Sequence, residues 1–259
     1  MSLVQLSAEV PALWDYDEVA AIAARRFGDR SQAVYFVLHD ELIRVRTLLS
    51  TDLFRSPFLQ SRIAYLRAQI QYLNDVGGYL RAGPAPHARI VSRHPTVLEY
   101  DRTVFDSRYS CAAEDVRSGL VHVKDRQFNP LQPGKCYMYV IDEYGELIVW
   151  NRAFRFADLV FGRNRATVHG VPVAHPLLVP ETLRVCAAGE FIPFACDPTG
   201  ATLGAAIVNT KSGHYRPPPT CVPLIEEVFD RIGLGPSDLD IFTLDPAIDA
   251  VDVAGPVTG

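Results

Sequence analysis

The chemically richest stretch of the sequence is the polar run 209–216, which reads Asn-Thr-Lys-Ser-Gly-His-Tyr-Arg and is followed by three prolines. His214 titrates near neutrality and can act as an acid, a base or a ligand, and Tyr215 adds a hydroxyl and an aromatic face. The glycine before His214 permits close approach of a ligand to the backbone, and the prolines fix φ. Four further side chains offer hydrogen-bonding groups suited to a phosphate or a carboxylate: Asn209, Lys211, Ser212 and Arg216. We expect a pre-organised ligand-binding loop; the alternative is a capped turn that satisfies its own polar groups.

Two more residues complete the candidate site. His175 lies in the apolar stretch 173–178, and Glu190 ends the run Ala-Ala-Gly-Glu. A histidine in such surroundings is commonly a buried, hydrogen-bonded residue; the other interpretation is that it projects into the same cleft as His214. In that case the two imidazoles serve as base and acid, and the carboxylate of Glu190 is available to handle a leaving group.

Other patterns argue against common site types. The sequence has no Walker-type loop, no Rossmann fingerprint and no G-x-S-x-G elbow, which disfavours common nucleotide-binding and serine-hydrolase classes. The five cysteines contain no C-x-x-C pair and suggest reduced, mostly buried thiols, so no metal site is expected. Four acidic residues and four histidines elsewhere in the chain form neither a metal-binding loop nor an H-E-x-x-H pattern. We expect them at the surface or in loops: Asp101, Asp106, Glu114, Asp115, His87, His94, His122 and His169.

Charge and composition narrow the range of partners. Lys and Arg number 25 against 30 Asp and Glu, a net charge of −5, so no overall positive field attracts nucleic acid or an anionic membrane. No apolar run reaches the ~18 residues that span a bilayer, and the first residues lack a signal-peptide pattern. We therefore predict a cytoplasmic protein whose partner is a small-molecule or nucleotide ligand or another protein, and neither nucleic acid nor a membrane.

The elements that would position these side chains suggest an α+β fold. Helical signals dominate residues 1–84, with segments 16–27 and 33–49 and a third that Ser56 caps. The apolar run 33–38 is also compatible with a strand, and we favour a helix. In the third segment Ile63, Leu66, Ile70 and Leu73 recur at helical spacing and predict a core-facing side. After a Gly-Pro-Ala-Pro run, short β-branched and aromatic segments with few helical periodicities predict a β-rich body over 85–245. We expect the helical part to pack on this mixed or antiparallel sheet, and residues 246–259 to form a loose tail.

Within the β-rich body, the sequence predicts two hairpins, a helix and a last strand. The hairpins join 136–141 to 146–150, and 189–195 to 203–208. Pro193 indicates that its strand is at an edge or is bulged. An amphipathic helix over 223–232 and a strand over 239–244 follow.

The order of these elements, with His175 upstream and Ser212-Gly213-His214-Tyr215-Arg216-Pro217 downstream, resembles a domain whose hallmark is S-G-H-Y-x-P. This domain occurs in bacterial and fungal proteins, some of them toxin- or effector-like, and a similar block occurs in plant IQ-motif calmodulin-binding proteins. The resemblance covers residues ~135–245. It departs at His175, which is followed by Pro176 and Leu177 rather than serines, and no IQ-type basic helix is evident.

The residue types allow three functional hypotheses. The first is an enzyme that transfers a group on a nucleotide-like or small-metabolite substrate, with His175, His214, Tyr215 and Glu190 as catalytic residues. Because a histidine, a tyrosine and a carboxylate also serve one class of ADP-ribosyltransferases, NAD is a possible cofactor. The second is a non-catalytic binding module of the S-G-H-Y-x-P type, and the third is a tailoring enzyme of small-molecule metabolism.

Overall fold

The computed structural model describes residues 13–51, 56–76, 85, 87–127, 131–160, 166–197 and 200–243. The chain divides into two compact units, Met1–Tyr79 and Leu80–Gly259. Helices and strands both contribute large shares of the described residues, so the α+β class is confirmed. The predicted tail at 246–259 lies outside the described residues.

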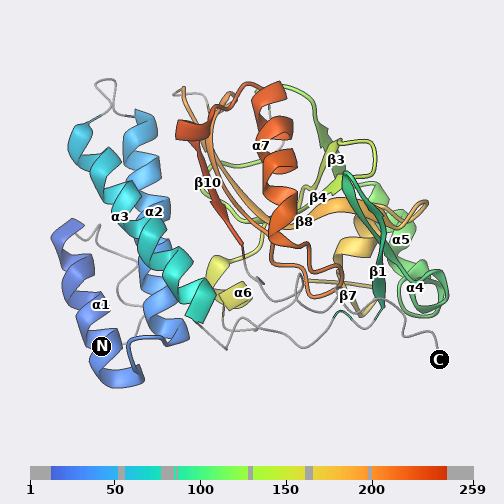
Figure 1. Ribbon diagram of the computed structural model, residues 1–259, viewed down its shortest axis with the longest axis horizontal. Coiled ribbons are helices and arrows are strands. Elements are labelled where there is room, and N and C mark those ends of the chain that lie inside the picture. Colours follow the sequence, from blue (N-terminus) through green and yellow to red (C-terminus); the bar gives the residue numbers. More distant parts are fainter. Residues whose placement is uncertain are drawn as a thin grey trace. The chain divides into compact units, whose positions relative to one another are not determined.

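The first unit is a set of three helices, shown side by side in Figure 1: α1 (Leu13–Phe27), α2 (Gln32–Thr51) and α3 (Pro57–Val76). The apolar run 33–38, which could also have been a strand, is helical and lies within α2, as predicted. The predicted apolar stripe of α3 is buried, and it consists of Ile63, Leu66, Ile70 and Leu73. Arg62 ties the helices together by ion pairs of 2.6 Å each with Glu41 of α2 and Asp17 of α1.

The second unit is built on an eight-stranded sheet in the order β1-β2-β8-β4-β5-β3, with β9 paired to β8 and β10 to β9. All pairs are antiparallel except β9 with β10. The strands are β1 (Ala88–Arg93), β2 (Thr96–Tyr100), β3 (Leu120–Val123), β4 (Tyr137–Asp142), β5 (Leu147–Trp150), β8 (Arg184–Ala195), β9 (Leu203–Asn209) and β10 (Leu239–Phe242). A separate two-stranded ribbon joins β6 (Thr167–Val168) to β7 (Val171–Pro172).

Both predicted hairpins are present. Strand β4 pairs with β5, and β8 pairs with β9. Pro193 lies where β8 pairs with β9 alone, because pairing with β4 ends at Phe191, and the β8–β9 register shifts after Phe194. The edge position and the irregularity explain how this strand accommodates a residue without an N–H.

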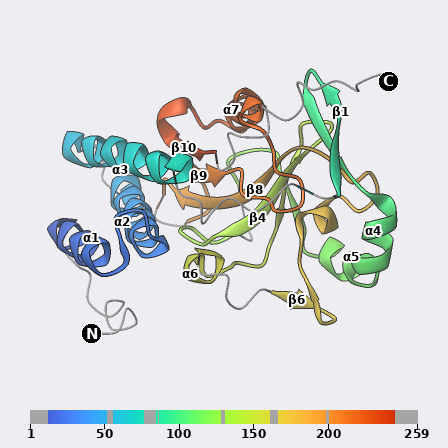
Figure 2. The ribbon, with the colours of Figure 1, turned by 60° about the horizontal axis from the view of Figure 1, so that its bottom comes forward.

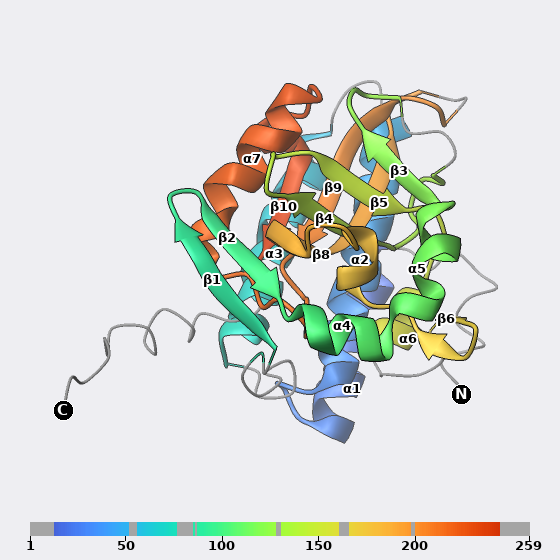
Figure 3. The same ribbon diagram turned by 90° about the vertical axis from the view of Figure 1, so that its right-hand side faces the viewer.

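Both faces of the sheet are covered, by elements that Figure 3 shows on opposite sides. Alternate β4 residues, including Tyr139, pack in a cluster with Phe229 of α7 (Val222–Arg231). The intervening residues, including Val140, pack in a second cluster with Leu177 of the 3₁₀ helix η2 (His175–Leu178) and with Val116 of α5 (Ser110–Arg117). Because successive strand residues point to opposite faces, this buried pattern explains the continuous apolar runs of β4 and β8.

Helix α5 and the preceding α4 (Arg102–Arg108) correct the expectation of few helices after residue 86. Figure 2 shows them next to the β1–β2 hairpin. Asp101, expected as solvated surface, is exposed but also caps α4, since its side chain accepts a hydrogen bond of 2.9 Å from Val104 N. Each of these helices is about two turns long, too short for a clear periodic signal. A further short helix, α6 (Phe156–Val160), follows β5.

Strand β8 and the end of β9 approach each other most closely at Gly189. A Cβ built on this residue would lie deep inside the van der Waals envelope of the Asn209 carbonyl oxygen. That oxygen also accepts a hydrogen bond of 3.1 Å from the Tyr139 hydroxyl, which helps to hold it in place. Glycine is therefore required at this position for a steric reason.

We predict that Gly189→Ala lowers the free energy of unfolding by at least about 3 kcal/mol, because backbone must move to admit a methyl group. Urea unfolding followed by circular dichroism measures the change. Gly213→Ala is the matched control, since a Cβ there meets no atom within 4 Å and should change stability by no more than about 1 kcal/mol. Equal stability of the two variants would contradict the close approach.

Candidate functional site

His175 begins η2 and is held against strand β8. Its side chain is 5% exposed, and its Nε2 is 3.1 Å from the carbonyl oxygen of Gly189. A carbonyl only accepts hydrogen bonds, so Nε2 carries the ring proton. Nδ1 then has a free lone pair, and no residue that the structure describes donates a hydrogen bond to it. The imidazole is thus fixed as the tautomer whose Nδ1 can accept a proton.

The surroundings keep this imidazole neutral. Burial lowers the pKa of His175 to about 3, with further lowering from the nearby His214 and Lys211, and the bond to Gly189 only partly opposes this. A charged imidazolium would lose its hydration here without gaining a counter-ion. His175 is therefore an uncharged acceptor at neutral pH.

His214 reaches the same place from the loop after β9. Ser212 shapes this loop, since its hydroxyl accepts from Tyr215 N at 3.2 Å and its carbonyl accepts from Arg216 N at 2.9 Å. The centroids of the His214 and His175 rings are 6.4 Å apart. The structure thus brings together the two histidines that the sequence analysis singled out, 39 positions apart in the chain, and His214 is the more exposed of the two.

A tyrosine that the sequence analysis missed completes the contact with His214. The hydroxyl of Tyr109, at the junction of α4 and α5, is 3.1 Å from His214 Nε2. The rings of Tyr109 and Tyr100 each pack against the imidazole, with centroids 5.9 Å from it. Tyr109 shares the helical spacing of the buried residues Phe105, Ala112 and Val116, but this pattern identifies a core-facing residue rather than a partner of His214.

The side chain of Asn209, at the end of β9, links strand β8 to the loop that carries His214. The Oδ1 atom of Asn209 accepts hydrogen bonds from Glu190 N at 3.0 Å and from Lys211 N at 2.9 Å. The Lys211 ammonium lies 3.9 Å from the Glu190 carboxylate. Burial raises the pKa of Glu190, and Lys211 and Asn209 oppose the shift. Three of the predicted site residues thus form one polar group next to Gly189.

Tyr215 lies near the histidines without facing solvent. Its side chain is 1% exposed, and its hydroxyl donates to the Leu183 carbonyl oxygen at 3.1 Å. Burial raises its pKa well above the usual value for tyrosine. In this arrangement Tyr215 is a core residue that anchors the loop. Arg216 is also buried, with a left-handed φ of 52°.

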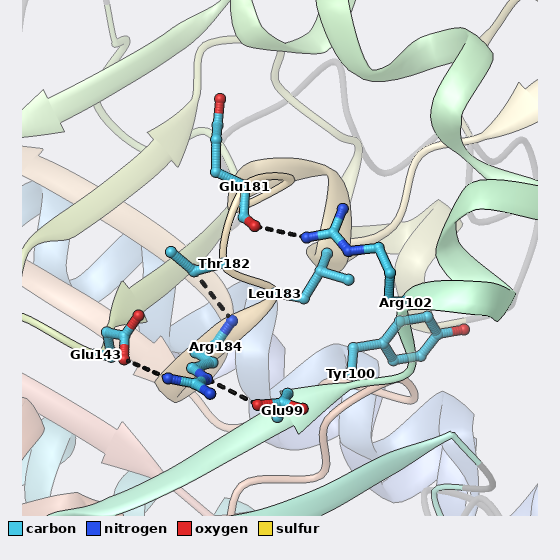
Figure 4. A pocket seen from close by; sticks show the side chains of 8 residues that line it. All are labelled: Glu99, Tyr100, Arg102, Glu143, Glu181, Thr182, Leu183 and Arg184. Carbon is cyan, nitrogen blue, oxygen red and sulfur yellow. Dashed lines mark hydrogen bonds and ion pairs between the residues drawn. The ribbon is translucent and has the colours of Figure 1, made fainter.

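Tyr100 also lines a surface pocket of about 310 Å³, and Figure 4 shows its lining. Arg184 pairs there with Glu99 at 2.7 Å and with Glu143 at 3.4 Å. Arg102 donates to the backbone oxygens of Pro180 and Glu181. The two cations of the pocket are therefore already engaged by the chain itself.

No protein-family model, curated protein or solved structure matches this chain. Among the described residues, no group of three or more His, Cys, Asp or Glu side chains could hold a metal ion. The described helices also include none that is long and apolar enough to cross a membrane. All five cysteines are free, and three of them, Cys136, Cys186 and Cys221, are buried.

The pKa of His175 predicts an acid-sensitive contribution to stability. The unfolded chain takes up a proton at this histidine near pH 6.5 and the folded chain only near pH 3, so stability is lost as the pH falls through this window. Relative to the non-titrating His175→Gln, wild-type protein should lose about 2 kcal/mol of unfolding free energy between pH 7 and pH 5. Parallel pH dependences in urea unfolding would contradict the buried neutral state.

Proposed function

We propose that this protein is an enzyme that transfers a group on a nucleotide-like or small-metabolite substrate, with His175 as general base and His214 as general acid. One observation carries the proposal: two imidazoles lie 6.4 Å apart, and each already uses its Nε2 in a hydrogen bond. For His175, Nδ1 is then the ring atom available to accept a proton.

The two rings differ in burial. His175 is buried and its Nδ1 is unprotonated; because its pKa in the substrate-free protein is about 3, it can take a proton from an attacking hydroxyl or water only where the negative charge of a bound substrate raises that pKa. The more exposed His214, in its imidazolium form, can give a ring proton to the leaving group. The lowering of the His175 pKa by His214 fits this division, because two adjacent imidazoles are not readily protonated together.

The neighbouring groups suit a substrate with a phosphate or a carboxylate. The Lys211 side chain is 30% exposed, and the backbone at Gly213 borders open space. An NAD-using reaction of the ADP-ribosyltransferase kind is one specific form of the proposal. In that form Glu190 supplies the carboxylate, and the phenol is Tyr109, whose hydroxyl lies 3.1 Å from His214 Nε2.

The test is a turnover screen with NAD, nucleoside phosphates and small organic acids, followed by chromatography of the products. Once a reaction is found, His175→Gln and His214→Asn should each lower kcat by about 10²- to 10⁴-fold, the usual contribution of a general acid or base. In the ADP-ribosyltransferase form, nicotinamide is released, and Glu190→Gln abolishes the release.

The matched control is His122→Asn. His122 is exposed and pairs with Glu146 on the β3–β5 part of the sheet, so its loss should leave kcat unchanged. Turnover that survives both His175→Gln and His214→Asn with folded protein would contradict the proposal.

A non-catalytic binding module is the second candidate, and the bonding of the loop favours it. Asn209, Ser212 and Tyr215 all use their side chains to hold backbone groups of the chain. This module would show a ligand-dependent thermal shift without turnover, and His214→Asn would weaken the shift. If a ligand binds and no substrate in the screen gives a product, the protein is a binding module rather than an enzyme.

A further inference from the structure

Helix α3 carries a second stripe of large side chains, on the side away from its buried stripe. Phe58, Tyr65 and Tyr72 recur at intervals of seven residues, and they are 64%, 48% and 48% exposed. Residues seven apart share one face of a helix, and this face is turned by roughly 150° from the buried stripe. Exposed apolar side chains that lie together, rather than singly, mark interaction sites. The row of rings therefore indicates a surface that another chain covers.

Short side chains alternate with the rings along this face. Ser61, Ala68 and Asp75 each follow one of the three rings by three residues, and all three are exposed. Alternating steps of three and four residues are the heptad spacing by which two helices pair. We call the whole set the α3 seam, and its members are Phe58, Ser61, Tyr65, Ala68, Tyr72 and Asp75.

The exposed surface of α3 is almost without charge. Asp75 is the one charged residue among the exposed positions of this helix, all of whose residues the structure describes. The exposed positions of α1, in contrast, include Asp17, Glu18, Arg25 and Arg26. A helix face that stays in water is normally polar and charged, whereas the centre of a protein interface is depleted of charge. The composition of the seam is therefore that of an interface.

The seam is complementary to itself when two copies run in opposite directions. If Tyr65 lies opposite Ala68 of the second copy, two-fold symmetry repeats this pair, and each ring of the seam meets a short side chain. No like charges then face each other across the seam. A two-fold interface requires a surface that fits its own copy, and the seam has this property. The other two pairs of the same register are Tyr72 with Ser61 and Phe58 with Asp75.

We propose that this protein forms a dimer with a second copy of its own chain, by antiparallel pairing of the two α3 seams. A parallel pair would place ring against ring and short side chain against short side chain, which leaves gaps between the helices. The seam is about 26 Å long and one helix wide, which is small for a stable protein interface. We therefore expect a reversible dimer that forms at micromolar concentrations.

Sedimentation velocity of the full chain from about 1 µM to about 200 µM tests the dimer. The wild type should shift from monomer to dimer, and Tyr65→Glu and Tyr72→Glu should each raise the dissociation constant at least about 100-fold, because each change puts two unpaired charges into the seam. Both side chains are exposed, so circular dichroism should show folded variants. Tyr144→Glu is the matched control, since this tyrosine is 75% exposed outside the seam, and it should dimerise like the wild type.

Two results would overturn the proposal. One is a wild type that stays monomeric at every concentration, which would mean that a different surface covers the seam. The other is a dimer that both seam variants retain, which would place the interface elsewhere on the chain.

Cross-linking tests the direction of pairing. The exposed cysteines are first removed by Cys111→Ser and Cys196→Ser, and the other three cysteines are buried, except as the test introduces new ones. On mild oxidation, Tyr72→Cys chains mixed with Ser61→Cys chains should form a disulfide between unlike chains. Tyr72→Cys chains alone should form little. Efficient disulfides between like chains would show parallel pairing and contradict the proposed register.

Discussion

The close approach of Gly189 to Asn209 is the constraint on which the rest of the site depends. Because Gly189 has no side chain, the end of β9 can lie against β8 with the Asn209 carbonyl where a Cβ would otherwise be. From this position the Asn209 side chain binds the amides of Glu190 and Lys211, which fixes where the following loop starts. The carbonyl of Gly189 itself holds His175. Gly189 thus binds His175 through its carbonyl and lies against Asn209, where the chain leads into the loop that carries His214.

Because the residues of the site are buried, their hydrogen bonds determine their orientation and their protonation. A buried polar group without a partner costs free energy, and His175, Glu190, Asn209 and Tyr215 are each buried with a hydrogen-bond or ion-pair partner. For His175 the outcome is an imidazole that is oriented, neutral and bare at Nδ1. For Glu190 it is a carboxyl group whose pKa is raised by burial, with Lys211 and Asn209 opposing the shift. The apolar surroundings that stabilise the fold therefore also shift the pKa values of His175 and Glu190.

Much of the fold was predictable because its signals are local. Alternating or continuous apolar strands joined by a tight turn identified both hairpins, and the spacing of Ile225, Val228 and Phe229 identified α7. The convergence of His175 and His214 could be stated only as a hypothesis, since sequence periodicity says nothing about which loops meet across a sheet. Helices α4 and α5 were missed because two turns leave little periodic pattern, and with them Tyr109 was missed. Tyr215, expected to face a ligand, is bound to the Leu183 carbonyl, a tertiary contact that no local pattern encodes.

The most direct test of this account is the protonation of the His175 ring, followed by ¹⁵N chemical shifts of both ring nitrogens between pH 4.5 and pH 8. The account predicts a proton on Nε2 and a bare Nδ1 across the whole range, without a titration step, because the pKa lies at about 3. A titration midpoint near the ordinary value of 6.5, or a proton on Nδ1 at neutral pH, would contradict it.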